Sequence, residues 1–549
     1  MLACNSDNFT DSVAVGALSD LALQNEQGVN LALTGAYSSL DGVRKNQAGN
    51  GWGAVGDDWW FDVIADDAHK GSTDGDQADL FLIETYDWNS GNGYFMAKWS
   101  SVFAGVNRAN NVIALINKIP DGNFNNQLAQ ARFLRAHFNF ELQKIFGKVP
   151  YISEQNFADS EFNQPNPGPI YDNIEADLQF AIDNLPASQG ADVGRANSWV
   201  AKAYMGKVLL QQHKWGAALT QLEDVINNGP YALLPEFDDN FRLAGENGSE
   251  SILAIQFTAD SGLSPNGNLA STLNFPGGGP FNSCCGFYQP SQDLVNAYQT
   301  DAGGLPLLDT FNQNDVANDY GIESSAPFTP ETGTLDPRLD YTVGRRGIDY
   351  NGWEVNPGKD WIRAGFSDIS GPYLPKKNIY HAGESANMGT GSWGQQSSGI
   401  NYYIIRYADV LLMAAEAAVE TNDLTKALTY VNLVRNRAKN STYVKDASGN
   451  DAANYKIEPY ASFTGQDMAR KAVRMERRLE LGMEGHRLFD LRRWGNSKDV
   501  LNAYITNESR VIPNFAGKSK AYQDKYDVLP IPISAIDLSG GILEQNSGY

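Results

Sequence analysis

The stretch RRLELGMEGHRLFDLRRWG, residues 477–495, decides how this chain is interpreted, because it is a dense basic segment in an acidic protein. Residues 470–495 hold eight Lys or Arg against four Asp or Glu, whereas the whole 549-residue chain has a net charge of −23. Glu476, Glu480 and Glu484 recur at helical spacing, and a glycine one residue later ends the helix that they predict. Arginine dominates over lysine, which suits planar, partly buried ion pairs. We therefore expect a structural clasp between helices and not a reactive site.

The overall composition argues against some classes of binding partner. A net charge of −23 argues against a nucleic-acid partner and, because of long-range repulsion, against a polyanionic ligand. The chain has no run of 18 or more apolar residues, so no transmembrane helix is predicted.

Three cysteines, Cys4, Cys284 and Cys285, are too few for a disulfide framework. Cys4 follows Met-Leu-Ala and precedes a polar stretch, like the end of a bacterial lipoprotein signal, so it is either a lipid attachment site or a free thiol. Cys284 and Cys285 either form a disulfide between neighbours in an oxidising compartment or serve as two small buried apolar side chains.

Hydrophobic periodicity predicts amphipathic helices over residues 97–118, 126–147, 171–185, 198–213 and 215–228. Two segments share one spacing of small and branched residues: Gly206, Ala218, Leu222 and Val225 recur as Ala415, Ala427, Val431 and Val434. Small residues at the first two positions let antiparallel helices approach closely. The pattern resembles a degenerate tetratricopeptide (TPR) helix pair, which is typical of a scaffold.

Residues 262–399 hold 21 Gly and 11 Pro in 138 positions, so this part of the chain is predicted to be rich in loops. We expect an N-terminal TPR-like helical platform over residues 1–250 with an acidic and aromatic loop at 50–95. A loop-rich, ligand-facing region follows over 251–400, and C-terminal TPR-like helices cover 401–549, all in one compact unit.

No catalytic signature stands in the right context. The sequence has no GxSxG or HExxH motif, and its five His are scattered without metal-ligand spacing, so neither a catalytic residue nor a metal is predicted. The sequence has 65 Asp and Glu, so the two catalytic carboxylates of a glycosidase cannot be identified without the distances between them. The acidic stretch 57–79 is either a set of acceptors for sugar hydroxyls or a solvated loop.

Aromatic residues in loops stiffened by Gly and Pro are the remaining candidates for a binding site, because rigid rings stack on the apolar faces of sugars. Three loops combine such rings with Asn, Asp or Cys: residues 350–361, 87–94 and 280–290. The predicted glycan-binding residues are Trp353, Trp361, Trp393, Tyr350, Trp88, Asn89, Phe287, Tyr288 and Asp58, with a Cys284–Cys285 disulfide as an apolar ledge beside them.

Four blocks carry a family resemblance: MERRLELGMEGHRLFDLRRWG (475–495), ARFLRAHFNFELQKIFGKVPYI (131–152), NYYIIRYADVLLMAAEA (401–417) and YDVLPIPISAID (526–537). Together they resemble the SusD/RagB family of surface glycan-binding lipoproteins of Bacteroidetes. The resemblance implies a mostly-α, SusD-like fold, in which TPR-like helical pairs form the scaffold and a loop-rich insertion carries the ligand site. The adjacent cysteines are not a hallmark of that family.

The resemblance also implies a function without catalysis and without a cofactor. Such a protein captures polysaccharide or oligosaccharide at the cell outer membrane, as a surface-exposed lipoprotein, and delivers it to a SusC-like TonB-dependent transporter. Its contact with the membrane is through an N-terminal lipid at Cys4. The family's binding residues lie in variable loops, so no site residue transfers by motif.

Two alternatives remain open: a glycoside hydrolase on a helical scaffold, and a TPR-like scaffold that binds only proteins. Release of reducing sugar would separate the first alternative from glycan capture, and a change of Trp fluorescence on adding glycan would separate the second. Net acidity favours a neutral glycan, and we expect a β-glucan such as laminarin.

Overall fold

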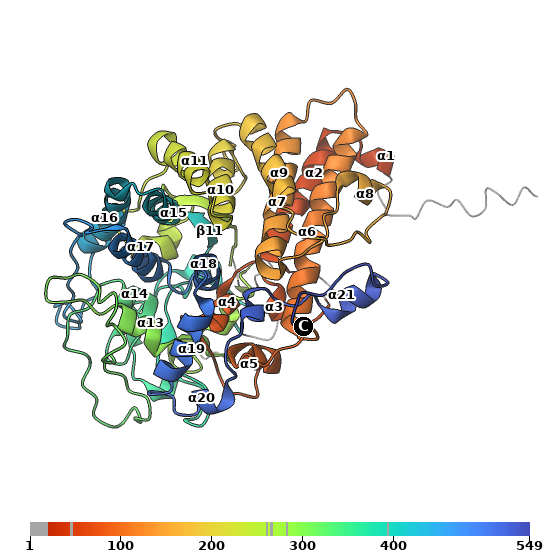
Figure 1. Cartoon of the computed structure of the whole chain (residues 1–549). Helices are drawn as coiled ribbons and strands as arrows, with labels where there is room; N and C mark the ends of the chain where they lie inside the picture. Colours follow the sequence, from red (N-terminus) through yellow and green to blue (C-terminus); the bar gives the residue numbers. More distant parts are fainter. Residues whose placement is uncertain (1–19, 44–47, 260–261, 264–266, 282–283, 392–394) are drawn as a thin grey trace, which may run out of the picture.

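The computed structural model describes residues 20–43, 48–259, 262–263, 267–281, 284–391 and 395–549. Its scaffold is a succession of helices in which each packs against the next, running from right to left across the upper part of Figure 1. The scaffold helices are α2 (Glu26–Tyr37), α6 (Gly93–Asn117), α7 (Asn125–Phe146), α9 (Tyr171–Asn184), α10 (Ser198–Gln211), α11 (Trp215–Asn228), α15 (Tyr407–Glu420), α16 (Leu424–Asn440) and α17 (Gln466–Leu481). The expected mostly-α architecture is confirmed, and the five helices predicted by periodicity all exist.

Further short helices connect this scaffold to the rest of the chain. They are α1 (Asp20–Leu23), α3 (Gly51–Ala54), α4 (Trp59–Ile64), α5 (Ala78–Glu84), α8 (Glu154–Ala158), α12 (Ser271–Asn274), α13 (Gln292–Ala297), α14 (Leu339–Thr342), α18 (Arg487–Trp494), α19 (Ser497–Glu508), α20 (Phe515–Lys518) and α21 (Ile533–Leu538). Among the described residues, no helix has both the length and the apolar character needed to cross a membrane.

The internal repeat is a real structural repeat of two helix pairs, α10–α11 and α15–α16. The turn residues His213 and Asn422 occupy equivalent positions, and both have a positive φ, 60° and 62°. In both turns the next backbone N–H, of Lys214 and of Asp423, donates to a carbonyl near the end of the first helix, at 3.0 Å and 2.8 Å. At Gly206 an added Cβ would lie 2.6 Å from Leu222, so the first position of the pattern requires a small residue, as predicted.

The loop-rich region occupies the lower left of Figure 1 and contains short strands in place of long elements. The strands in the described part of the chain are β1 (Ala68–Gly71), β2 (Ser251–Ile255), β3 (Gly262–Leu263), β4 (Phe287–Pro290), β5 (Val343–Gly344), β6 (Asp349–Tyr350), β7 (Glu354–Val355), β8 (Leu374–Pro375), β9 (Met388–Thr390), β10 (Gln396–Ser398) and β11 (Tyr402–Arg406). They form small sheets of two or three strands, β1–β4, β10–β9–β3, β11–β2, β5–β8 and β6–β7.

Because such short strands bury little surface, the loops need an apolar centre of their own. The structure provides a separate cluster that we call the loop core, made of Phe275, Phe281, Tyr350, Trp361, Ile362, Ala364, Leu374, Ile379, Tyr380 and Ile400. The larger apolar cluster of the protein extends from Leu33 near the start of the described chain to Leu543 near its end. The described part of the loop region thus packs around its own apolar centre.

The basic C-terminal segment is the clasp that its sequence predicted. Glu476 and Glu480 of α17 and Glu484 of the turn after it are buried and pair with cations from other elements. A buried ion network connects Arg338, Lys377, Arg406, Arg435 and Arg437 with Glu250, Asp336, Glu476, Glu480 and Glu484.

The acidic stretch 57–79 supplies further partners, so its interpretation as a solvated loop is wrong for residues 57–67. Arg478 donates to Asp67 at 2.9 Å, and Arg487 donates to Asp66 at 2.7 Å. The backbone N–H of Gly485 donates to the carboxylate of Asp62 at 3.0 Å. Acids near one end of the sequence therefore neutralise the basic segment near the other end.

Candidate functional site

The aromatic residues predicted in the loop 350–361 are used mainly inside the protein. Tyr350 and Trp361 are 0% and 4% exposed and meet edge to face, with ring centroids 5.6 Å apart. The Tyr350 hydroxyl donates to the carbonyl of Pro375, and burial raises the pKa of this hydroxyl well above its ordinary value. These two rings form the centre of the loop core, so in this conformation neither is open to a sugar.

Trp353 is placed differently, because it is only partly buried. It follows a tight turn in which Asn351 and Gly352 have positive φ values of 51° and 74°, as expected for an Asn-Gly hairpin turn. Its ring packs 5.3 Å from the ring of Phe281, and its indole N–H donates to the carbonyl of Tyr380 at 3.1 Å. The loop core thus holds Trp353 by one ring contact and one hydrogen bond while leaving part of the side chain accessible.

Phe287, Tyr288 and Trp88, three more of the predicted rings, are buried. Phe287 and Tyr288 are each 1% exposed in β4, and Trp88 is 5% exposed, with its ring centroid 4.4 Å from that of Tyr526. Asn89 is exposed, and its side-chain oxygen accepts from the backbone N–H of Gly91 at 2.8 Å. The three rings therefore serve as packing residues in this conformation.

Asp58 is buried in an ion pair and not presented to solvent. Lys98 donates to its carboxylate at 3.2 Å and Lys144 at 2.7 Å. Burial alone would raise the pKa of Asp58, but the two ammonium groups hold it well below its ordinary value. Its predicted role as an acceptor for sugar hydroxyls is not available in this arrangement. Cys4 and Trp393 lie outside the described residues.

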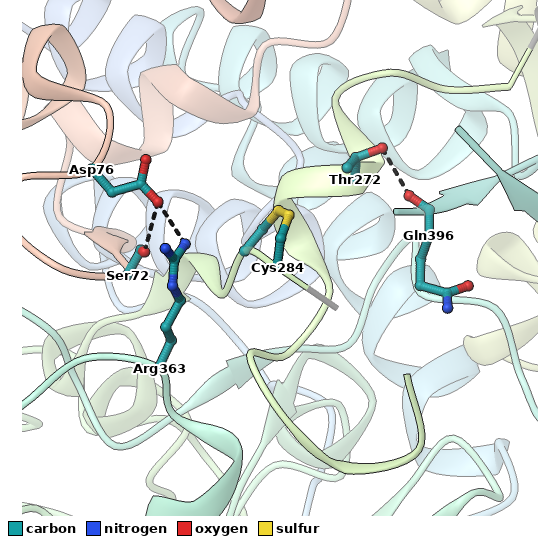
Figure 2. The surroundings of a disulfide bond; sticks show 7 residues. Ser72, Asp76, Thr272, Cys284, Arg363 and Gln396 are labelled. Atoms are coloured by element: carbon teal, nitrogen blue, oxygen red, sulfur yellow. Dashed lines mark hydrogen bonds and ion pairs between the residues drawn. A yellow bond between two sulfur atoms is a disulfide. The ribbon is translucent and has the colours of Figure 1, made fainter. Parts of the chain in front are cut away.

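Cys284 and Cys285 are joined by a disulfide bond in this structure, and Figure 2 shows its surroundings. Cys285 is 4% exposed, whereas Cys284 is exposed. The bond therefore has one side against the protein and one side toward solvent.

An ion pair stands on one side of the disulfide. Arg363 donates to the carboxylate of Asp76 at 2.5 Å, and the Ser72 hydroxyl donates to the same oxygen at 3.2 Å (Figure 2). The side chains of Arg363 and Asp76 are 38% and 30% exposed, so both can still reach a ligand.

Gln396 lies on the other side of the disulfide and is hydrogen-bonded to the residues that hold Trp353. The Thr272 hydroxyl donates to its backbone carbonyl at 2.8 Å (Figure 2). Its side chain donates to the carbonyl of Phe281 at 2.7 Å and accepts from the Tyr380 hydroxyl at 2.6 Å. Phe281 and Tyr380 are the residues that hold Trp353.

We call the resulting group of accessible residues the disulfide surface; it consists of Asp76, Cys284, Trp353, Arg363 and Gln396.

Backbone contacts fix the two halves of this surface relative to each other. Strands β1 and β4 pair antiparallel, and the backbone N–H of Ser72 donates to the carbonyl of Gly286 at 2.7 Å. Lys70 is buried and donates to the carbonyl of Gly71 at the end of β1 and to two carbonyls of the loop that follows, those of Thr73 at 2.8 Å and Asp76 at 2.9 Å. Burial lowers the pKa of this lysine. The loop bearing Asp76 is therefore tied directly to the segment bearing the disulfide.

Glycines bring the third segment close. A Cβ added at Gly277 would lie 2.6 Å from the Cβ of Arg363, and one added at Gly279 would lie 2.3 Å from the Trp361 ring. The run of Gly and Pro at 276–280, read from sequence as turn signals, thus allows close contact between segments.

Chemically, the residues of the disulfide surface offer apolar contacts, a guanidinium, a carboxylate and an amide. These groups suit a neutral ligand with hydroxyls and an apolar face. Among the described residues, no group of three or more His, Cys, Asp or Glu could hold a metal ion. Sequence reasoning missed Arg363 and Gln396, because their roles depend on partners 287 and 115 residues away.

Comparisons with known proteins agree with this fold. The model of the SusD family matches residues 249–549, and a second model, described as starch-binding associating with outer membrane, matches residues 59–210. SusD-like protein P25 of Formosa agariphila is 26% identical over 438 residues, which are 77% of this chain and 73% of that protein. A SusD-like carbohydrate binding protein from Bacteroides fragilis superposes with a TM-score of 0.72 at 21% identity, covering 95% of this chain and 99% of that one. A laminarin binding SusD-like protein gives 0.66 at 23% identity, with 96% and 100% covered.

Proposed function

Because the chain belongs to the SusD family, we propose that it captures oligosaccharide at the cell surface and delivers it to a SusC-like TonB-dependent transporter of the outer membrane. The match of the family model to residues 249–549 is the observation that carries this proposal. The second match, to a starch-binding family associated with the outer membrane, supports it at residues 59–210. The role is binding without catalysis.

The proposed ligand is a neutral glycan, and the first choice is a β-glucan such as laminarin. Two observations support this choice. The net charge of −23 disfavours encounter with sulfated or uronic acid polymers. One of the similar solved structures is that of a laminarin binding protein. We place the glycan on the disulfide surface, where Trp353 supplies the accessible aromatic ring.

The proposed location is the outer leaflet of the outer membrane, with a lipid on Cys4. The composition of residues 1–8, with a cysteine after a short apolar start and before a polar stretch, supports this attachment. Growing cells in labelled palmitate and testing whether Cys4→Ser abolishes labelling would check it.

Affinity gel electrophoresis tests the ligand directly. Laminarin, a neutral α-glucan, a xylan and alginate would be cast into native gels, and the wild-type protein should be retarded by laminarin and not by alginate. Release of reducing sugar from the same polysaccharides should stay at background. Retardation by alginate alone would contradict the proposed ligand class, and steady release of sugar would revive the hydrolase alternative.

A matched pair of variants tests the location. Trp353→Ala should weaken retardation by laminarin, whereas Phe162→Ala should not. Phe162 is an exposed ring, 46% accessible, that lines a pocket with residues of α21 and with no residue of the disulfide surface. Equal effects of both variants would show that the disulfide surface is not the site.

A further inference from the structure

The geometry points to the Cys284–Cys285 disulfide as a direct ligand contact: we propose that its solvent side packs against the apolar face of a sugar ring while Arg363 and Asp76 bind the hydroxyls at the ring's edge. This inference rests on the proposed function and adds to it a named subsite and the chemistry by which it recognises a neutral hexose.

The first step is the exposure of the bond. Cys284 is exposed and Cys285 is buried, so the disulfide lies at the boundary between the protein and solvent. Sulfur is polarisable and only weakly polar, which suits contact with C–H groups. A disulfide between neighbours also closes an eight-membered ring with the intervening peptide bond. Such a ring has little freedom to lose when a ligand binds.

The second step is the polar partner beside it. Arg363 has five N–H donors in a planar fork, and among the described residues Asp76 is the hydrogen-bond partner that the structure gives it. Because the Arg363 side chain is 38% exposed, further donors can reach a ligand. Asp76 adds an acceptor that Ser72 and Arg363 hold in place. Donor and acceptor side by side match two neighbouring hydroxyls of a sugar.

The third step is the fixed relation between these groups. Gly286 follows Cys285 directly, and a Cβ added at Gly286 would lie 3.4 Å from the backbone nitrogen of Gly277 and 3.6 Å from the Cβ of Arg363. The carbonyl of Gly286 also accepts from the backbone N–H of Ser72 at 2.7 Å. The segments that carry the disulfide, the guanidinium and the carboxylate therefore meet at one glycine. A rigid ligand can therefore contact the disulfide, the guanidinium and the carboxylate without a rearrangement of the protein.

A pyranose with equatorial hydroxyls fits this arrangement, because its C–H groups form an apolar face and its hydroxyls project around the edge. A polyanion fits poorly, since Asp76 and the net charge of −23 repel it. The subsite therefore selects neutral oligosaccharides of glucose or a similar hexose.

Isothermal titration calorimetry with laminarihexaose tests the proposal on the full chain. The variant Cys284→Ser/Cys285→Ser should bind about three- to tenfold more weakly than wild type, with an unchanged far-UV spectrum. Arg363→Gln should bind about tenfold more weakly or worse. Phe162→Ala is the control and should bind like wild type.

A second arm avoids mutation. Counting labelled thiols in unfolded, lipid-free wild-type protein, in which Cys4 keeps its thiol, should give one before reduction and three after it, since the sequence has three cysteines. Reduction of the folded protein with a phosphine should weaken binding as the double variant does; the phosphine supplies two electrons and is oxidised to its oxide, while one water molecule supplies the oxygen and the two protons that the thiols take up. This arm remains decisive if the double variant does not fold.

The outcomes separate the subsite from the proposed function. If wild type binds laminarihexaose and the double variant or the reduced protein binds equally well, the disulfide subsite is overturned and glycan capture stands. Labelling of all three thiols without reduction overturns the subsite as well. If wild type binds no glycan of the panel, the proposed function and the subsite fall together.

Discussion

Replacing Glu480 by glutamine tests the central claim about the scaffold, that the basic segment holds the fold together and does not bind ligand. Glu480 is fully buried, and Arg406 and Arg338 donate to its carboxylate at 2.6 Å and 2.9 Å. Arg437 donates to it as well. Burial alone would raise the pKa of Glu480, but the three guanidinium groups hold it well below its ordinary value. Glu480→Gln keeps the shape of the side chain and removes its charge.

The magnitude follows from the charge balance of the buried ion network. The network joins five cations to five anions, so it is neutral as a whole. Glu480→Gln leaves one positive charge uncompensated inside the protein, and breaking a buried pair in this way costs about 3–5 kcal/mol. An unfolding entropy of about 2.1 cal/mol/K per residue gives roughly 1.2 kcal/mol/K for the whole chain, so the melting temperature should fall by about 3–4 °C.

Chemical denaturation and differential scanning fluorimetry would measure the change. Glu458→Gln is the matched control, because Glu458 pairs with Lys439 on the surface, where the two side chains are 45% and 39% exposed. Such pairs contribute about 0–1 kcal/mol, so this control should melt within about 1 °C of wild type. Adding Arg437→Met to Glu480→Gln restores neutrality and should recover part of the loss. If Glu480→Gln behaves like the control, the network is not what stabilises this region. If it melts normally and no longer binds glycan, the ligand site belongs here.

Three further outcomes are expected. His69 lies between two buried carboxylates, each 2.8 Å from a ring nitrogen. Burial opposes the charge of His69, but the hydrogen bonds to the carboxylates raise its pKa to about 9. These bonds therefore contribute roughly 3 kcal/mol to the free energy of unfolding below pH 6.5, and this contribution is lost as pH rises through about 9. Denaturation curves at pH 6 and pH 9.5 should differ less for His69→Gln than for wild type, and an equal difference would contradict the assignment. Gly206→Val should destabilise by about 1–3 kcal/mol in denaturant titrations, because its Cβ meets a buried leucine at 2.6 Å, and an unchanged midpoint would refute close helix contact there. Trp353→Ala should weaken laminarihexaose binding about five- to tenfold in calorimetry, in line with about 1–1.5 kcal/mol for an aromatic contact, and unchanged affinity would remove this ring from the site.

The helical part of the fold was predictable from the sequence because its signals are local. The stripe that includes Leu134 and Phe138 predicts α7 directly, and both side chains are buried, at 0% and 2% exposed. The repeat could be found because both helix pairs have a small residue at the first position of the same spacing, Gly206 and Ala415, and a Cβ added at Gly206 would lie 2.6 Å from Leu222. Such periodicities need no knowledge of distant partners.

The partners of the charged residues could not be predicted in the same way. Arg478 pairs with Asp67, 411 positions earlier, and nothing in the spacing of either residue identifies the other. The acidic stretch and the basic segment were both visible as unusual compositions. Their mutual neutralisation depends on the tertiary fold, which brings α4 and α18 together.

The aromatic residues of the loops show why composition overestimates the number of rings that are available to bind a ligand. A region without long strands or helices cannot bury backbone hydrogen bonds in regular ladders, so it needs large side chains to hold its loops, and Tyr350 and Trp361 meet that need. The same rings are what a sugar site would use, and the sequence alone cannot distinguish the two roles. Only Trp353 among the described candidate rings stays partly accessible. In the proposed site, the buried rings of Phe281 and Tyr380 hold Trp353 and Gln396 in place. A ligand that meets such a surface loses little free energy to reordering of the protein.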